Sequence, residues 1–342
     1  MDLSLTDVQE AIRDGVGRFL AKTSSPDRVR AAEPLGWDRA VWDGLAGMGV
    51  PAMGVAPGLG GGGADLADLA VVAGQAGAHL APAPVVEAMV TARLLARFHV
   101  TAEDWLLHLV DGTGPVTLAL RPATDGLATL VPGGAVADAV VALDGDDLVV
   151  VALPGERRSP ANLGSAPLAD LRVDAEGRTV LATGSDARQA HGQALDEWRA
   201  LTAVALAGLG RAAFDIGVRY VTERRQFGVP VGSFQAVQHR LADVATDLDG
   251  ADLLAHKAVW ALDRGTGDAD RLVPMAFAHA GAVAQAAASA ALHLHGGYGF
   301  MEEYDVQLYF RRAKAARLVL GDPRRDLQTL ADRLFGPVEG SA

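Results

Sequence analysis

The sequence predicts an α+β protein, mostly α-helical, in which an N-terminal helical domain and a C-terminal four-helix bundle flank a small β domain. Two observations predict this architecture. Apolar residues recur at helical spacing in the first third of the chain and again in its last part, whereas residues 115–183 hold short Val- and Leu-rich runs separated by Gly, Pro and Asp. The 342 residues suffice for several domains with their own cores. We place these domains at residues 1–112, 113–190 and 191–342.

The N-terminal domain is expected to begin with a helix capped by Thr6 and Gln9, because Thr-x-x-Gln ahead of an apolar face is a capping-box pattern. A second helix is expected after Asp38, which is a favourable N-cap residue. The helical pattern over residues 65–98 contains two prolines, and each proline lacks the backbone N–H that a helix interior needs. This segment is therefore predicted to form two helices.

The β domain is predicted from runs such as 116–120, 139–143 and 148–153. Residues 144–147, Asp-Gly-Asp-Asp, separate the last two runs and are typical of a hairpin turn. The bundle is predicted from helical patterns over about 195–223, 233–264, 268–295 and 303–334. Frequent Ala and Gly on these helices permit close packing, either within the chain or between subunits.

Composition excludes several classes of function. The formal charge of −12 argues against broad binding to nucleic acid or to anionic membranes, since both need a basic face. The chain has no cysteine, which excludes disulfides, thiol nucleophiles and sulfur-bound zinc, and we expect no metal site. We find no signal peptide, and no stretch that is apolar over the roughly 20 residues of a membrane span. These features predict a soluble, cytoplasmic protein.

Two segments of the last third contain residue types that bind phosphate-bearing cofactors. In residues 223–235, Arg224 precedes Phe227, a glycine and Gln235. A guanidinium can form paired hydrogen bonds to pyrophosphate oxygens, and glycine lets backbone N–H groups approach them. The second segment, residues 293–304, contains a Gly-Gly pair. The alternative interpretation is a surface turn followed by a helix-terminating loop.

The chain resembles the acyl-CoA dehydrogenase family over essentially its whole length. The resemblance is carried by the order of the three domains and by four segments, which are Arg224-Arg225-Gln226-Phe227-Gly228, Gln235, Leu241-Ala242-Asp243 and His295-Gly296-Gly297-Tyr298-Gly299-Phe300-Met301-Glu302-Glu303-Tyr304. It implies a flavin, FAD, whose ADP half is held by the C-terminal bundle of a neighbouring subunit. The residues that it assigns to FAD are Arg224, Gln226, Phe227, Gln235, His293, Gly296 and Gly297. His293 stands where the family usually has Gln.

The resemblance also implies a substrate contact. Asp196 and Arg199 match a family pair, Asp-x-x-Arg, that lies near the reacting end of the acyl-CoA substrate. A structural salt bridge between residues i and i+3 of a helix explains the same pair.

The family's catalytic base is missing from both of its usual positions. Members remove the α-proton of the thioester with a glutamate after the motif Arg-Asp-Ala-Lys, and the corresponding residue here is Leu320. Other members place the base immediately before the residue that Arg199 matches, and this chain has Trp198 there. Glu197 is one residue away, but one step along a helix turns a side chain by roughly 100 degrees, so it is a weak substitute. Asp322 is a weaker one.

The β domain also departs from the family. Members usually carry a Thr-Glu-Pro segment, a Gly-Ser-Asp segment and a Trp-containing strand that line the flavin ring. Residues 118–124 keep only the proline, and no tryptophan occurs between Trp105 and Trp198. The missing residues belong to a subunit's own active site, whereas the retained ones hold the flavin of its neighbour.

This division favours a subunit of an α2β2 acyl-CoA dehydrogenase, of the kind that acts on steroid side-chain CoA thioesters. The chain would complete the FAD site of a paralogous partner for α,β-dehydrogenation, and an electron-transfer protein would accept the electrons. One alternative is a self-sufficient homotetramer with a relocated base. Another is a non-catalytic scaffold subunit.

Overall fold

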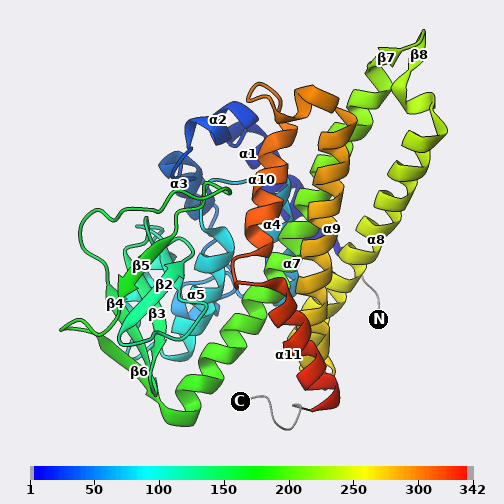
Figure 1. Cartoon of the computed structure of the whole chain (residues 1–342). Coiled ribbons are helices and arrows are strands. Elements are labelled where there is room, and N and C mark those ends of the chain that lie inside the picture. The colour runs from blue at the N-terminus through cyan, green and yellow to red at the C-terminus, as the bar shows by residue number, and fades with distance from the viewer. Residues whose placement is uncertain (1–3, 337–342) are drawn as a thin grey trace.

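The computed structural model describes residues 4–336 and contains helices at both ends of the chain with a β domain between them (Figure 1). The N-terminal helices are α1 (Asp7–Thr23), α2 (Pro26–Ala31), α3 (Arg39–Gly47), α4 (Leu66–Ala78), α5 (Val85–Arg97) and α6 (Glu103–Val110). Thr6 and Gln9 form both bonds of the predicted capping box, and Asp38 caps α3. The predicted break between α4 and α5 is confirmed. The short helices α2 and α6 were not predicted.

The β domain consists of two sheets. Its strands are β1 (Val116–Leu118), β2 (Leu127–Val131), β3 (Ala139–Asp144), β4 (Asp147–Ala152), β5 (Ala169–Arg172) and β6 (Thr179–Thr183). Four strands pair in the order β1-β3-β4-β6, with β1 parallel to β3 and the other pairs antiparallel, and β2 pairs with β5. The predicted hairpin joins β3 to β4, since Asp144 pairs with Asp147 and Gly145 adopts a φ of 58°.

The C-terminal part is built around three long helices. Its elements are α7 (Gly184–Glu223), β7 (Arg225–Gln226), β8 (Val229–Pro230), α8 (Gln235–Asp263), α9 (Ala269–Leu294), α10 (Val306–Arg317) and α11 (Pro323–Phe335). Helix α7 begins well before the expected start near 195. The fourth predicted helix, 303–334, is instead two helices, because Gly321 adopts a φ of 103° and Pro323 starts a new helix.

Two bundle helices, α7 and α9, each contain an 18-residue window that is apolar enough by composition to span a membrane, with mean hydropathies of 1.5 and 1.3 over these windows. The expectation that no stretch reaches this level is therefore wrong. Of the two apolar windows, 50% and 61% of the residues are buried inside the protein. Their composition fits helices at the centre of a bundle, which are apolar on most sides.

One large hydrophobic core joins the N-terminal helices, one face of the four-stranded sheet and the bundle. A smaller core fills the β domain between its two sheets. Helix α7 connects these parts, because it starts directly after β6 and packs along α4, α5, α8 and α9 (Figure 1).

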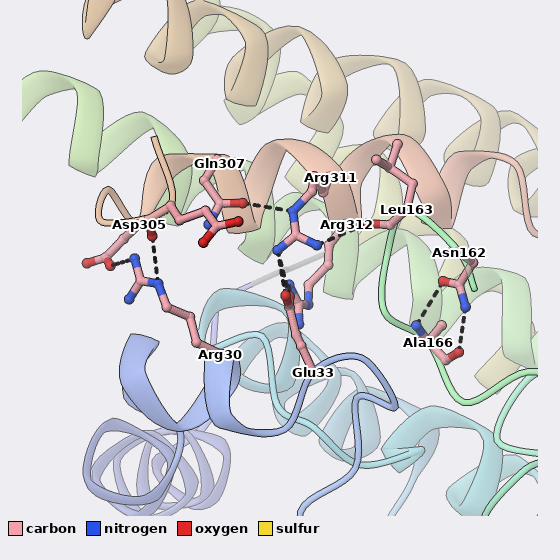
Figure 2. A network of polar contacts seen from close by, with 10 residues as sticks. Arg30, Glu33, Asn162, Leu163, Ala166, Asp305, Gln307, Arg311 and Arg312 are labelled. Carbon is pink, nitrogen blue, oxygen red and sulfur yellow. Dashed lines mark hydrogen bonds and ion pairs between the residues drawn. The ribbon is translucent and has the colours of Figure 1, made fainter. Parts of the chain in front are cut away.

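A charged cluster around Glu33 holds three separate parts of the chain together (Figure 2). Glu33, just after α2, accepts hydrogen bonds from Arg311 at 2.7 and 2.9 Å and from Arg312 at 3.0 Å. Arg311 also donates to the carbonyl oxygen of Leu163, in the loop between β4 and β5, at 3.4 Å. We call Glu33, Arg311 and Arg312 the Glu33 clamp. It fixes α10 against the N-terminal helices.

Candidate functional site

The first predicted cofactor segment forms a hairpin at the far end of α7 and α8, where it projects from the rest of the protein (Figure 1). Arg224 is the C-cap of α7, and Gln226 pairs with Val229 across the hairpin. Phe227 and Gly228 form the tip with φ angles of 54° and 85°. The Phe227 side chain is 92% exposed and meets the Phe234 ring edge-on at 6.2 Å. An apolar ring this exposed marks a surface suited to a ligand or another chain.

The second segment follows the end of α9. His293 lies exposed in the last turn of α9, and the 3₁₀ helix η3 (Gly296–Phe300) comes next. Gly296 adopts a φ of 62°, and a Cβ on either Gly296 or Gly297 would meet nothing within 4 Å. Their backbone is therefore accessible to a ligand. Gly299 serves packing instead, since its Cβ would lie 2.5 Å from the carbonyl oxygen of Leu292.

The fold brings the two segments together. The Arg224 guanidinium carbon lies 5.9 Å from the centre of the Tyr298 ring, which belongs to η3. Gln235 opens α8 and is exposed, as is His293. Neither of these two side chains forms a hydrogen bond within residues 4–336.

This surface fits the phosphate-bearing half of FAD. Arg224 is exposed and, within the described part of the chain, has no ion pair or side-chain hydrogen bond to compete with a phosphate. Gly296 supplies a left-handed backbone turn, and turns of this kind orient N–H groups toward anions. A cation and an open glycine backbone at one place are the groups that a pyrophosphate requires.

Asp196 and Arg199 lie in a charged cluster between α7 and α11. Their side chains form the i, i+3 salt bridge at 3.2 Å, and Arg333 of α11 approaches Asp196 at 3.5 Å. Asp326 of α11 is buried nearby. Burial raises the pKa of its carboxyl, and the Arg199 guanidinium partly offsets this. The cluster holds α11 against α7, so Asp196 and Arg199 have the structural role that the salt-bridge interpretation assigned to them. The Nε atom of Arg199 is buried and has no hydrogen-bond partner among residues 4–336.

Neither family base position offers a proton acceptor. Leu320 lies in the turn between α10 and α11 and packs against the core. Trp198 is 2% exposed and packs against Phe277 at a ring distance of 5.6 Å. Its indole N–H donates to Glu87 of α5 at 3.0 Å.

Glu87 is a carboxyl that sequence reasoning missed. Burial raises the pKa of Glu87, and the hydrogen bond from Trp198 only partly opposes this. The Trp198 position thus has a carboxyl beside it, supplied by another helix. The available signal was a single acidic residue within the apolar run Val85-Val86-Glu87-Ala88-Met89-Val90.

The two substitute bases named from sequence are poorly suited to the task. Glu197 accepts hydrogen bonds from Nε and Nη2 of Arg93, at 2.8 and 3.1 Å, and lies beside a cavity of about 190 Å³. This cavity is lined by residues of α5 and α7 and by Gly54, and Trp198 is not among its lining residues. Asp322 caps α11, and hydrogen bonds from Arg324 lower its pKa to about 2. A carboxylate of such low basicity is a weak proton acceptor.

The protein has a helical domain, a small β domain and a bundle with an exposed cationic turn between α7 and α8. This combination fits a protein that binds a phosphate-bearing cofactor. Residues 6–112 match the acyl-CoA dehydrogenase N-terminal domain, and residues 188–335 match the acyl-CoA dehydrogenase C-terminal domain. The chain belongs to the acyl-CoA dehydrogenase family. Members of this family are oxidoreductases that use FAD.

Several relatives resemble the chain over its whole length. Acyl-CoA dehydrogenase IpdE2 of Mycolicibacterium smegmatis is 31% identical over 97% of this chain and 100% of the relative. The structure of the ChsE4-ChsE5 complex from Mycobacterium tuberculosis is 26% identical with a TM-score of 0.87, covering 99% of this chain and 100% of the matched one. The Tcur3481-Tcur3483 steroid ACAD G363A variant is 28% identical with a TM-score of 0.85, covering 96% and 98%.

Proposed function

We propose that this chain is the FAD-completing subunit of a two-chain acyl-CoA dehydrogenase, which introduces an α,β double bond into an acyl-CoA thioester. Its paralogous partner carries the catalytic base and the contacts to the flavin ring. The substrate class that we propose is a CoA thioester of a steroid side chain. An electron-transfer protein accepts the electrons from the reduced cofactor.

One observation carries this proposal. The residues that would bind FAD across a subunit interface are exposed, and Arg224 lies beside η3. The two family base positions hold Leu320 and Trp198, and the Trp198 indole N–H already donates to Glu87. A chain built in this way can bind a partner's cofactor without performing the proton abstraction itself.

Two relatives support the two-chain arrangement. Both named structures, ChsE4-ChsE5 and Tcur3481-Tcur3483, pair two different chains, and the second is described as a steroid acyl-CoA dehydrogenase. Each matches this chain at more than a quarter identity over nearly its full length. By analogy we assign this chain to one half of such a pair.

The division of labour follows from the groups present. FAD, when bound, would supply the acceptor for a hydride from the β-carbon of the substrate. Arg224 would neutralise the pyrophosphate charge, and the backbone at Gly296 and Gly297 would donate to its oxygens. Phe227 and Gln226 at the hairpin tip, together with Gln235 and His293, would contact the remainder of the nucleotide half. The proton on the α-carbon leaves to a carboxylate of the partner.

The test is to purify the chain alone and together with its paralogous partner, and to measure bound flavin by its visible spectrum and dehydrogenation by turnover. The chain alone should be colourless and inactive, and the pair should hold one FAD per two different chains. A yellow, active homo-oligomer of the single chain would contradict the proposal. A pair that forms without any flavin would favour the scaffold alternative.

A substitution in the pair tests the FAD contact. Arg224→Ala should weaken FAD binding by about 10- to 100-fold, the range expected for losing charge-assisted hydrogen bonds. FAD retention after gel filtration measures this. Arg188, an exposed arginine near the other end of α7, provides the control, and Arg188→Ala should retain FAD. Equal retention in both variants would place the cofactor elsewhere.

The self-sufficient alternative is favoured by Glu87, whose buried carboxyl lies at the Trp198 position. In that case Glu87→Gln should abolish turnover of the single chain while FAD remains bound. Glu197→Gln tests the residue named from sequence in the same assay.

A further inference from the structure

Four aromatic or imidazole rings form a continuous column that joins the two cofactor segments. Tyr220 of α7 stacks on His295 at 4.0 Å between ring centres, with an interplanar angle of 24°. His295 meets the edge of Tyr304 at 5.9 Å, and Tyr304 stacks on Tyr298 at 5.5 Å. Tyr298 then faces the Arg224 guanidinium at 5.9 Å. We call Tyr220, His295, Tyr304 and Tyr298 the ring column.

The column begins at Tyr220 of α7, and its other end, Tyr298, faces Arg224, the C-cap of α7 one helical turn after Tyr220. The backbone N–H of Arg224 donates to the carbonyl oxygen of Tyr220 at 2.8 Å, and the Arg224 carbonyl accepts from Val231 of the hairpin at 2.8 Å. The other three rings come from the segment that joins α9 to α10. The column therefore links the end of α7 to the Gly296–Gly297 turn by side-chain contact.

The orientation of the central ring is fixed. His295 is only 4% exposed, and its Nδ1 lies 2.7 Å from the carbonyl oxygen of Ala291. A carbonyl oxygen only accepts, so Nδ1 carries the hydrogen and the ring cannot rotate without losing this bond. A buried imidazole held in this way can serve as a fixed support for the tyrosines on either side.

The loop is also held from the opposite side. Arg30 of α2 donates to the carbonyl oxygen of Glu302 at 2.9 Å and to the carboxylate of Asp305 at 2.7 Å (Figure 2). Tyr304 lies between these two residues in the sequence. The segment that carries Tyr298 and Tyr304 is thus fixed by the N-terminal domain as well as by the column.

We propose that the ring column is a positioning device that holds the exposed Arg224 side chain over the Gly296–Gly297 turn before a phosphate-bearing ligand binds. This inference rests on the proposed function, which makes that ligand the pyrophosphate of FAD. A free arginine side chain occupies many rotamers, and binding a phosphate would require ordering one of them. The face of Tyr298 attracts the guanidinium and selects the rotamers that point to the turn.

The test is a double-substitution cycle in the FAD-loaded complex. The rate of FAD release on dilution is measured by the rise in flavin fluorescence. Tyr298→Leu removes the ring face and should speed FAD release by about 2- to 5-fold, the range for a partly exposed cation–π contact. Tyr298→Phe keeps the ring and should release FAD at the wild-type rate. Adding Tyr298→Leu to Arg224→Ala should cause no further increase, because Tyr298 acts through Arg224.

Matched controls separate positioning from folding. Phe300 lies on the same 3₁₀ helix, is 69% exposed and packs on Phe310 outside the column, so Phe300→Leu should leave FAD release unchanged. Without FAD, all variants should keep the wild-type melting temperature, because bound ligand itself raises that temperature. Additive effects of Tyr298→Leu and Arg224→Ala, or faster release from Tyr298→Phe, would overturn the positioning role.

The outcomes also distinguish this inference from the proposed function. If Arg224→Ala releases FAD while Tyr298→Leu does not, the FAD site stands and the column is only structural. If Arg224→Ala has no effect, the FAD site itself is misplaced. If the single chain holds FAD as a homo-oligomer, the same cycle is measured on that species.

Discussion

At the residue scale, Trp198, at a position where the family resemblance expects a base, has a structural role. Its ring fills the core beside Phe277, and its N–H supplies a hydrogen bond to the buried carboxyl of Glu87. A buried polar group without a partner costs more than a net hydrogen bond gains. The two residues are therefore expected to depend on each other energetically, although they lie on different helices.

We predict that Trp198→Phe lowers the free energy of unfolding by about 1–3 kcal/mol, because it leaves the Glu87 carboxyl without this donor while keeping most of the ring volume. Urea denaturation at neutral pH measures the change. Glu87→Gln is the control, since an amide oxygen can accept the same indole bond, and this variant should be as stable as the wild type or more so. If Trp198→Phe leaves the free energy of unfolding unchanged, another group forms a hydrogen bond with the Glu87 carboxyl in its place.

The same pair has a pH dependence whose sign follows from the raised pKa. Because burial favours the protonated carboxyl, the folded protein binds this proton more tightly than the unfolded chain, whose carboxyl titrates near 4.5. Stability should therefore fall as the pH rises from that value toward the higher folded pKa. Glu87→Gln should remove this part of the pH profile.

At the scale of secondary-structure elements, α4 and α7 pack with almost no space between their backbones. A Cβ added to Gly77 of α4 would lie 1.9 Å from the carbonyl oxygen of Ala205, and one added to Gly208 would lie 2.3 Å from that of Gly74. Contacts this short cannot be absorbed by side-chain movement. The glycines of α4 and α7 thus permit close approach, and for α7 this is one of the two uses, within the chain or between subunits, that the sequence left open.

We predict that Gly77→Ala lowers the free energy of unfolding by about 1–3 kcal/mol, the usual cost of overpacking a core. Gly192 on α7 is the matched control, since a Cβ there would meet nothing within 4 Å. Gly192→Ala should raise stability by roughly 0.5–1 kcal/mol through better helix propensity. Thermal denaturation followed by circular dichroism tests whether Gly77→Ala lowers the stability and Gly192→Ala raises it.

Elements with strong local signals were predictable, and those defined by distant contacts were not. The caps at Thr6 and Asp38 depend on neighbouring residues only, so they could be located from sequence. Helix α2 has six residues, too few for an apolar period. The first turns of α7 bury mainly alanines, Ala187, Ala190 and Ala194, whose small side chains give a weak apolar signal. The sequence prediction places no helix break at Gly321, although Pro323 follows it.

The candidate site shows the same limit. The two glycine- and arginine-containing segments could be identified because each is contiguous. The contacts of Arg224 with Tyr298 and of Trp198 with Glu87 could not, since they join residues far apart in the chain and depend on how helices cross. Sequence alone therefore named the surface but not the groups that orient it.

At the scale of the whole molecule, the Glu33 clamp joins parts that would otherwise be connected mainly by apolar packing. Arg312 stands at the second position of the segment that matches the family's Arg-Asp-Ala-Lys, so a cation replaces an anion there. Glu33 accepts from both this residue and Arg311, which balances part of the added charge. The long loop after β4 is bound to the same helix through Leu163 (Figure 2).

The clamp gives the protein a predictable response to acid. Burial alone would raise the pKa of Glu33, but hydrogen bonds and charge from Arg311 and Arg312 outweigh it and hold the pKa below the usual value of 4.5. A carboxyl with a lowered folded pKa contributes stability above its unfolded pKa and loses it as the pH falls through the folded value. The clamp should therefore be intact at neutral pH and weaken below about pH 4.5.

We predict that Glu33→Gln lowers the free energy of unfolding at pH 7 by about 1–3 kcal/mol, since two partly buried guanidiniums lose a charged acceptor. The difference from wild type should shrink as the pH falls below about 4.5, because the wild-type carboxyl then becomes protonated too. Urea denaturation between neutral and acidic pH measures both effects. Glu302, an exposed glutamate on the nearby loop, supplies the control, and Glu302→Gln should follow the wild-type profile. If the two variants behave alike at every pH, the clamp contributes nothing to stability, and other contacts, such as apolar packing and the Arg30–Asp305 ion pair, hold these parts together.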